Sequence, residues 1–138
     1  MLVCVVCWGI KLSIDYNRTA FVKPNVHCEH CGPINSLEEI DDLLAPSIII
    51  LNEKGYTTQA CCSGHLLHAS AYIMFRPNVK ISDFLSAPKG FDFDHSLWSA
   101  QFSIRKYFGT LPTGELFRKQ LQSALDVLEW AEKLSTKQ

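Results

Sequence analysis

Two short clusters of cysteine and histidine are the residues of this sequence best suited to chemistry. Cys28 and Cys31 are separated by two residues, and Cys62 and His65 repeat this spacing around Ser63-Gly64. Thiolate and imidazole are the ligands that zinc prefers, usually four in a tetrahedron. The spacing therefore predicts one zinc ion bound by Cys28, Cys31, Cys62 and His65. Because four protein ligands leave no position for water, we expect a structural metal rather than a catalytic one.

The third zinc ligand is ambiguous by one residue, because Cys61 also precedes His65 closely. Neighbouring residues of a strand point to opposite faces, so only one of Cys61 and Cys62 should bind the metal. We favour Cys62, because Ser63-Gly64 then forms a second two-residue turn like the first. An alternative without metal is a nucleophilic Cys61 paired with His65 or His68, which would require a lowered thiol pKa.

A further pair, Cys4 and Cys7, has the same spacing as Cys28 and Cys31. The two residues between them, Val5-Val6, are apolar and β-branched, whereas a zinc-binding turn favours glycine or polar residues. We therefore expect Cys4 and Cys7 to be buried apolar residues of an N-terminal strand.

The elements that must position these residues indicate an α+β fold, with a small mixed or antiparallel sheet packed by two helices and stabilised by one zinc ion. Alternating apolar residues and strand-forming residue types indicate the strands, and a loop with exposed aromatic residues is expected near the middle of the chain. Strands are expected within residues 2–8, 10–14, 20–23, 56–60, 71–75 and 98–107, a helical turn at 81–85, and the loop at 87–95.

Two helices are expected from capping signals and apolar periodicity. The first should begin at the capping box Ser36-Leu-Glu-Glu39, kink or break at Pro46, and end at Gly55. The second should begin near Thr113, with an apolar stripe that faces the core; a partner-binding helix is the alternative. The stripe consists of Phe117, Leu121, Ala124, Leu125, Leu128 and Ala131.

Length and composition set limits on the class of protein. A chain of 138 residues predicts a single domain, over 1–134, with 135–138 as a free tail. Thirteen basic side chains are scattered among fourteen acidic ones, and the absence of a basic patch disfavours duplex DNA as a partner. The apolar N-terminal segment is too short to span a membrane and lacks a basic signal-peptide region. Six cysteines in such a chain favour a reducing compartment, the cytoplasm.

The segment Gly55-Tyr-Thr-Thr, followed by Cys62-Ser-Gly-His65 and Tyr72-Ile-Met-Phe75, resembles the signature of the wybutosine-synthesis tRNA methyltransferase family. It is also similar to a group of small uncharacterised bacteriophage proteins in which a cysteine pair precedes the same strand and turn. The first resemblance implies an S-adenosylmethionine-dependent RNA-modifying enzyme, with Thr58, Ser63 and His65 near the substrate. The second implies a phage-type protein in the host cytoplasm.

The chain lacks a phosphate-binding glycine loop, a close carboxylate pair and a nucleophile elbow, which favours a non-enzymatic role. We therefore predict a zinc-binding accessory domain that binds a host protein or a small anionic ligand, for example as a counter-defence inhibitor. Thr58, Ser63, Gly64 and His68 are the candidate ligand-binding residues. The alternative function is the S-adenosylmethionine-dependent RNA-modifying enzyme.

Overall fold

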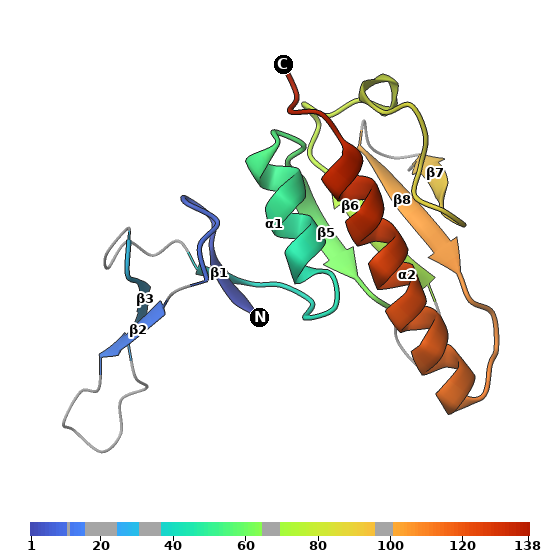
Figure 1. Ribbon diagram of the computed structural model, residues 1–138, viewed down its shortest axis with the longest axis horizontal. Helices are drawn as coiled ribbons and strands as arrows, with labels where there is room; N and C mark the ends of the chain where they lie inside the picture. Colours follow the sequence, from blue (N-terminus) through green and yellow to red (C-terminus); the bar gives the residue numbers. More distant parts are fainter. Residues whose placement is uncertain (11, 16–24, 31–36, 65–69, 96–100) are drawn as a thin grey trace. The chain divides into compact units, whose positions relative to one another are not determined.

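The computed structural model describes residues 1–10, 12–15, 25–30, 37–64, 70–95 and 101–138 (Figure 1). Contacts between these residues divide the chain into two compact units, Met1–Ile40 and Asp41–Gln138. The single domain expected over residues 1–134 stays a prediction.

The unit Met1–Ile40 is built from two pairs of short antiparallel strands. Strand β1 (Leu2–Cys4) pairs with β4 (Leu37–Glu39), and β2 (Leu12–Asp15) pairs with β3 (Asn25–Cys28). Beyond β1 and β4, the N-terminal ammonium group donates to the carbonyl oxygen of Ile40 at 2.6 Å. This pairing ties the beginning of the unit to its end. The strand expected at 20–23 lies outside the described residues.

The N-terminal strand is shorter than its valine-rich sequence predicts. It ends at Cys4, and the chain turns over residues 5–7. The Trp8 N–H donates to the Cys4 carbonyl at 2.8 Å, and the Cys4 N–H donates to the Gly9 carbonyl at 3.0 Å. Cys4 is fully buried as expected, but Cys7 lies in the turn and is partly exposed, so its placement in a strand was wrong. The strand propensity of the two valines is overridden because β4 pairs only with Leu2–Cys4.

The unit Asp41–Gln138 is an α+β structure with a four-stranded antiparallel sheet in the order β5-β6-β8-β7. Helices α1 and α2 cover one face of this sheet (Figure 1). The fold class predicted from the sequence is thereby confirmed, with the sheet antiparallel. The elements are β5 (Thr58–Cys62), β6 (Ser70–Phe75), β7 (Asp92–His95), β8 (Phe102–Tyr107), α1 (Ala45–Glu53), α2 (Thr113–Lys133) and a 3₁₀ turn at Ile81–Asp83. Neither helix in the described part of the chain is both long and apolar enough to cross a membrane.

Helix α1 begins nine residues later than its capping box predicts. Residues Leu37–Glu39 form β4 instead, and Pro46 lies in the first turn of the helix. The predicted helix start at Ser36 was therefore wrong. A helix with Pro46 in its first turn agrees with one of the two predicted alternatives, a break at Pro46. The three residue pairs that β4 forms with β1 outweigh a local capping preference, and proline is tolerated in a helix mainly at its first turn. The predicted end is confirmed, because Gly55 follows the helix with a φ of +92°.

The core between sheet and helices is aromatic. Phe84 is the centre of a ring cluster, with ring centroids at 5.0 Å from Tyr56, 5.2 Å from Phe75 and 5.1 Å from Trp130. Residues 87–91 form a loop in which Lys89 and Gly90 are exposed, as expected, but the predicted exposure of its aromatic residues was wrong, and residues 92–95 form β7. Phe91 is buried, and Phe93 lies in β7 at 6.2 Å from Phe84. The Phe91 ring is buried because removing an aromatic side chain from water buries a large apolar area.

Ser135 and Lys137 in the C-terminal segment make defined contacts, so the free tail expected at 135–138 was wrong. The Tyr56 hydroxyl donates to the Ser135 carbonyl at 2.7 Å, and the Lys137 N–H donates to the Lys54 carbonyl at 2.7 Å. Because tyrosine and backbone groups pair when they are removed from water, this polar segment is held against the end of α1.

Candidate functional site

Cys62 is the predicted zinc ligand whose side chain lies in the described part of the chain. It is the last residue of β5, is 6% exposed, and its Sγ accepts a hydrogen bond from the Gly64 N–H at 3.3 Å. Cys28 ends β3, whereas Cys31 and His65 lie outside the described residues. Within the described residues, no group of three or more His, Cys, Asp and Glu could hold a metal. The zinc site therefore stays a prediction.

The two adjacent cysteines of β5 have different environments. The strand register places Cys61 on the sheet face of Ile73 and Cys62 on the face of Tyr72. Burial raises the pKa of the Cys61 thiol from its ordinary value of 9.0 to about 11. Thiolate is the reactive form of cysteine, so Cys61 is a poor nucleophile at neutral pH.

The turn after β5 is fixed by Asp41, which precedes α1. Its Oδ2 accepts hydrogen bonds from the Ser63 N–H at 2.9 Å and from the Ser63 hydroxyl at 2.8 Å, while its Oδ1 accepts one from the Leu43 N–H at 3.1 Å. Ser63 is itself 9% exposed. The predicted ligand-binding hydroxyl is thus committed to holding the turn.

Gly64 completes this turn for a steric reason. Its φ is +113°, and a Cβ at this position would lie 3.0 Å from the Phe108 ring. The Gly64 carbonyl accepts a hydrogen bond from the Gln120 amide at 2.8 Å, which connects the turn to α2. Glycine is needed here because other residues rarely adopt this backbone conformation and no space exists for a side chain.

Thr58 lies at the opposite end of β5 from Ser63, about 16 Å away for five residues of extended chain. Its N–H donates to Asn52 Oδ1 at 3.1 Å, and its Oγ1 accepts from Asn52 Nδ2 at 2.9 Å. Thr58 therefore anchors the strand to the end of α1. The structure does not bring it together with Ser63 and Gly64, and His68 lies outside the described residues.

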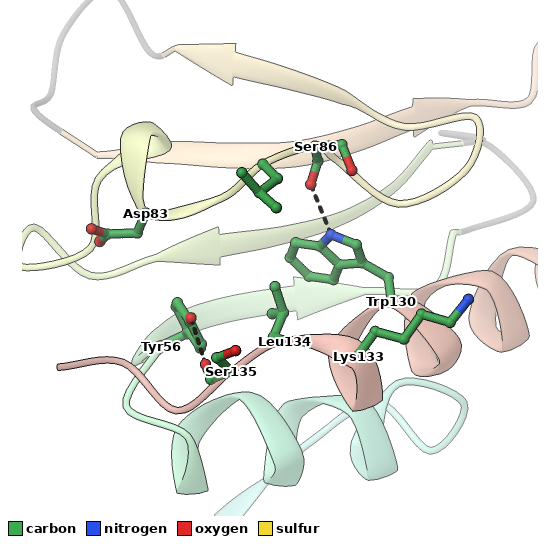
Figure 2. Close-up of a pocket in the computed structure, with 8 residues that line it drawn as sticks. Tyr56, Asp83, Ser86, Trp130, Lys133, Leu134 and Ser135 are labelled. Atoms are coloured by element: carbon green, nitrogen blue, oxygen red, sulfur yellow. Dashed lines mark hydrogen bonds between the residues drawn. The ribbon is translucent and has the colours of Figure 1, made fainter.

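A cavity of about 290 Å³ lies between the end of α2 and the segment around the 3₁₀ turn, and sequence reasoning missed it (Figure 2). The Trp130 Nε1–H donates to the Ser86 carbonyl at 2.8 Å, so this polar group is already paired. Asp83 and Lys133 lie on opposite sides of the Trp130 ring in this view. The Lys133 Nζ forms an ion pair with Glu129 Oε1 at 2.8 Å. The lining residues are Tyr56, Asp83, Leu85, Ser86, Trp130, Lys133, Leu134 and Ser135. They come from separate segments, and no spacing in the sequence connects them.

An exposed apolar strip runs along α2. Phe117, Leu121 and Leu125 are 56%, 38% and 59% exposed, and residues four apart lie on the same face of a helix. The prediction that this stripe faces the core was wrong for these three residues, whereas Ala124 and Ala131 are buried as expected. We call Phe117, Leu121 and Leu125 the α2 strip. It was misassigned because a second apolar row, which includes Leu116 and Val127, packs in the core instead.

In three comparisons, no family model, no curated protein and no solved structure matches the chain. The class of protein is therefore defined by the architecture, an α+β protein whose four-stranded antiparallel sheet is covered by two helices on one face. Because one fold can carry many functions, the function must be argued from the geometry of the sites.

Proposed function

We propose that this chain is a non-catalytic binding protein that engages a protein partner through the α2 strip and is stabilised by one structural zinc ion. The exposure of Phe117, Leu121 and Leu125 on one face of a helix carries the proposal. They extend over about 12 Å of helix and expose apolar surface on the order of 300 Å². Large apolar side chains gathered in this way gain free energy when a partner removes them from water. An amphipathic helix that contributes its apolar face to a groove is a common mode of recognition.

The charges on α2 indicate the chemistry of the partner. The first half of the helix carries Arg118 and Lys119 against the single acidic Glu115, and the second half carries Asp126, Glu129 and Glu132 against the single basic Lys133, so the net charge changes from positive to negative along α2. A matching surface would place acidic groups opposite the beginning of α2 and basic groups opposite its end. Such complementarity orients the partner and raises the association rate more than it raises affinity.

Other described groups support a non-catalytic role and a protein partner rather than a small anionic ligand. The Ser63 hydroxyl donates a hydrogen bond to the Asp41 carboxylate, and burial raises the pKa of the Cys61 thiol. In the cavity near Trp130, Lys133 is paired with Glu129 and the lining also contains Asp83, so its charge does not select an anion. We retain the phage-type accessory role, including inhibition of a host defence protein, as the biological form of this proposal.

The test uses Leu121→Arg as the perturbation and Lys119→Glu as its control. Both positions are exposed on α2, but only Leu121 belongs to the α2 strip. Wild-type protein and both variants are immobilised and exposed to host lysate, after circular dichroism has shown equal helix content and melting temperature. We expect a stoichiometric partner retained by wild type and Lys119→Glu and lost by Leu121→Arg. Retention by Leu121→Arg contradicts the role of the strip.

Two further measurements separate the competing functions. Sedimentation equilibrium of the same proteins shows whether the partner is a second copy, which Leu121→Arg should then dissociate. Calorimetric titration with S-adenosylmethionine should give no heat. A saturable heat of binding would support the RNA-modifying enzyme and contradict the non-catalytic role.

A further inference from the structure

The sheet face opposite the helices carries two tyrosines and an arginine side by side. In β6, Ile73 and Phe75 are fully buried on the side of the helices, so the residues between and before them belong to the opposite face (Figure 1). The strand register pairs Tyr72 of β6 with Arg105 of β8, and Tyr107 lies two residues further along β8 on the same face. We call Tyr72, Arg105 and Tyr107 the sheet platform.

The sheet platform is accessible although it belongs to the two central strands of the order β5-β6-β8-β7. Tyr107 is 73% exposed, whereas Phe102 and Ile104, on the helix side of the same strand, are 3% and 0% exposed. An antiparallel sheet can leave one face in water. A large aromatic side chain on such a face, however, gains free energy when a ligand covers it.

The Arg105 guanidinium is held in a fixed position on the sheet platform. Its Cζ lies 4.5 Å from the Tyr72 ring centroid and 5.9 Å from the Tyr107 ring centroid, which are cation–π distances. Its Nη1 donates to Ser70 Oγ at 3.0 Å, and its Nε forms an ion pair with Asp94 Oδ2 at 3.2 Å. Because these contacts come from three strands, the rings and the guanidinium form a preorganised surface, and little conformational entropy is lost when a ligand stacks on it.

The composition of the sheet platform favours an unpaired nucleobase as the ligand. Aromatic rings and guanidinium planes are the surfaces on which the bases of single-stranded RNA stack. Since Asp94 already neutralises Arg105, the platform offers little charge to a free anion, and stacking must supply most of the affinity. A duplex keeps its bases stacked inside the helix, so it does not match this surface.

The polar groups around the sheet platform favour RNA over DNA. Ser70, Asp92 and Asp94 belong to the same face by strand register. Their hydroxyl and carboxylate oxygens can accept hydrogen bonds from ribose 2′-hydroxyl groups, which DNA lacks, and from the amino groups of bases. Arg76 directly follows β6, continues the alternation from Tyr72 and is exposed, so it is positioned to contact a phosphate.

From these observations we infer that the sheet face opposite the helices binds single-stranded RNA, with bases stacked on the Tyr107 ring and on the Arg105 guanidinium above Tyr72. This inference goes beyond the proposed function, because the α2 strip belongs to a helix on the other side of the sheet (Figure 1). Protein partner and RNA would therefore use different surfaces of the unit Asp41–Gln138.

The experiment titrates the full chain into fluorescently labelled single-stranded decamers of uridine and of adenosine and follows fluorescence anisotropy. Tyr107→Ala is the perturbation, and Tyr107→Phe keeps the aromatic ring. Leu85→Ala is the matched control, because it shortens an exposed apolar side chain that lies beside Trp130 on the helix side of the sheet. We expect Tyr107→Ala to lower the affinity for RNA by about 5- to 150-fold, with little change in the two other variants and equal melting temperatures throughout.

A second variant separates stacking from charge. Arg105→Lys keeps the positive charge but removes the guanidinium plane, so it should weaken RNA binding without changing the salt dependence. The thymidine deoxydecamer should bind more weakly than the uridine decamer, and duplex RNA should not compete.

Four results would overturn the inference. The first two are the absence of saturable binding to either RNA and an equal affinity of wild type and Tyr107→Ala. Equal affinity for the DNA decamer would overturn the assignment to RNA. Self-association of the wild-type chain that Tyr107→Ala abolishes would assign this face to a second copy instead. Capture of the protein partner from lysate depends on Leu121 and not on Tyr107, so failure of RNA binding leaves the proposed function in place.

Discussion

Replacing Lys54 by methionine tests how the end of α2 is stabilised. The Lys54 ammonium group donates hydrogen bonds to the carbonyls of Ala131, Glu132 and Leu134 at 2.8, 2.7 and 2.6 Å. The last carbonyls of a helix lack partners within the helix, and a cation there also interacts favourably with the helix dipole. Lys54 thus caps α2 from the residue that follows α1.

The expected cost follows from the number and kind of these bonds. A hydrogen bond to a charged group contributes about 1.5–3 kcal/mol when buried, but these carbonyls can be partly rehydrated once the ammonium is removed. We therefore expect Lys54→Met to lower the free energy of unfolding by about 2–3 kcal/mol, or the melting temperature by roughly 6–12 °C. Methionine retains most of the apolar stem, so the change reports mainly the lost cation.

Urea denaturation monitored by circular dichroism measures this change, with Lys133→Met as the matched control. Lys133 also lies at the end of α2, but its side chain is 73% exposed and pairs only with Glu129 among the described residues. Exposed pairs of this kind contribute little, so the control should stay close to wild type. If the two variants differ by less than about 0.5 kcal/mol, the capping role assigned to Lys54 is refuted.

The remaining predictions concern strand β5 and the turn that follows it. Gly64→Ala should destabilise the protein by about 2–4 kcal/mol, whereas Gly109→Ala, which has a positive φ but no atom within 4 Å of its Cβ, should cost about 1 kcal/mol in the same thermal melts. Asp41→Ala should cost about 2–3 kcal/mol in urea denaturation, more than Ser63→Ala, because it removes an acceptor used by both the N–H and the hydroxyl of Ser63. Cys61 should react slowly with iodoacetamide at pH 8, and its rate, followed by mass spectrometry, should rise up to about pH 11. Because the folded protein holds this proton more tightly than the unfolded chain, stability should fall as pH rises from 9 to 11.

Specific results would contradict each of these predictions. Equal melting temperatures for the two alanine variants would show that the close approach of Phe108 to Gly64 does not constrain the fold. If Asp41→Ala is no less stable than Ser63→Ala, the Asp41 carboxylate does not anchor the turn. Alkylation of Cys61 at pH 8 as fast as that of an exposed thiol would contradict its raised pKa and reopen its candidacy as a nucleophile.

Local sequence signals predicted some element boundaries and misplaced others. Gly55 terminates α1 as expected, because a left-handed backbone after a helix is a local requirement that glycine satisfies wherever the helix lies. The helix start was misplaced because residues Leu37–Glu39 pair with β1, which is more than thirty residues earlier in the chain. A capping box describes only the nearest residues and carries no information about such a distant strand.

In the candidate sites, too, local sequence patterns predicted some features correctly and misplaced others. Cysteine spacing predicted a zinc site, which stays a prediction, and Cys4 and Cys7 were assigned to a strand because Val5-Val6 has high strand propensity. Residues 5–7 form a turn instead, which is closed by hydrogen bonds from the Trp8 N–H to the Cys4 carbonyl and from the Cys4 N–H to the Gly9 carbonyl. The apolar residues of α2 likewise predicted an amphipathic helix, yet could not indicate which of its two apolar rows faces the sheet.

The sequence by itself determined the α+β class, the helix beginning at Thr113, the glycine after α1 and the spacing of the cysteine pairs. These features follow from local backbone preferences and from the chemistry of single side chains. Tertiary structure decided the start of α1, the burial of Phe91, the exposure of the α2 strip and the capping of α2 by Lys54. Each of these depends on contacts between residues far apart in the chain, and the free energy of such contacts exceeds the small local preferences that a sequence pattern records.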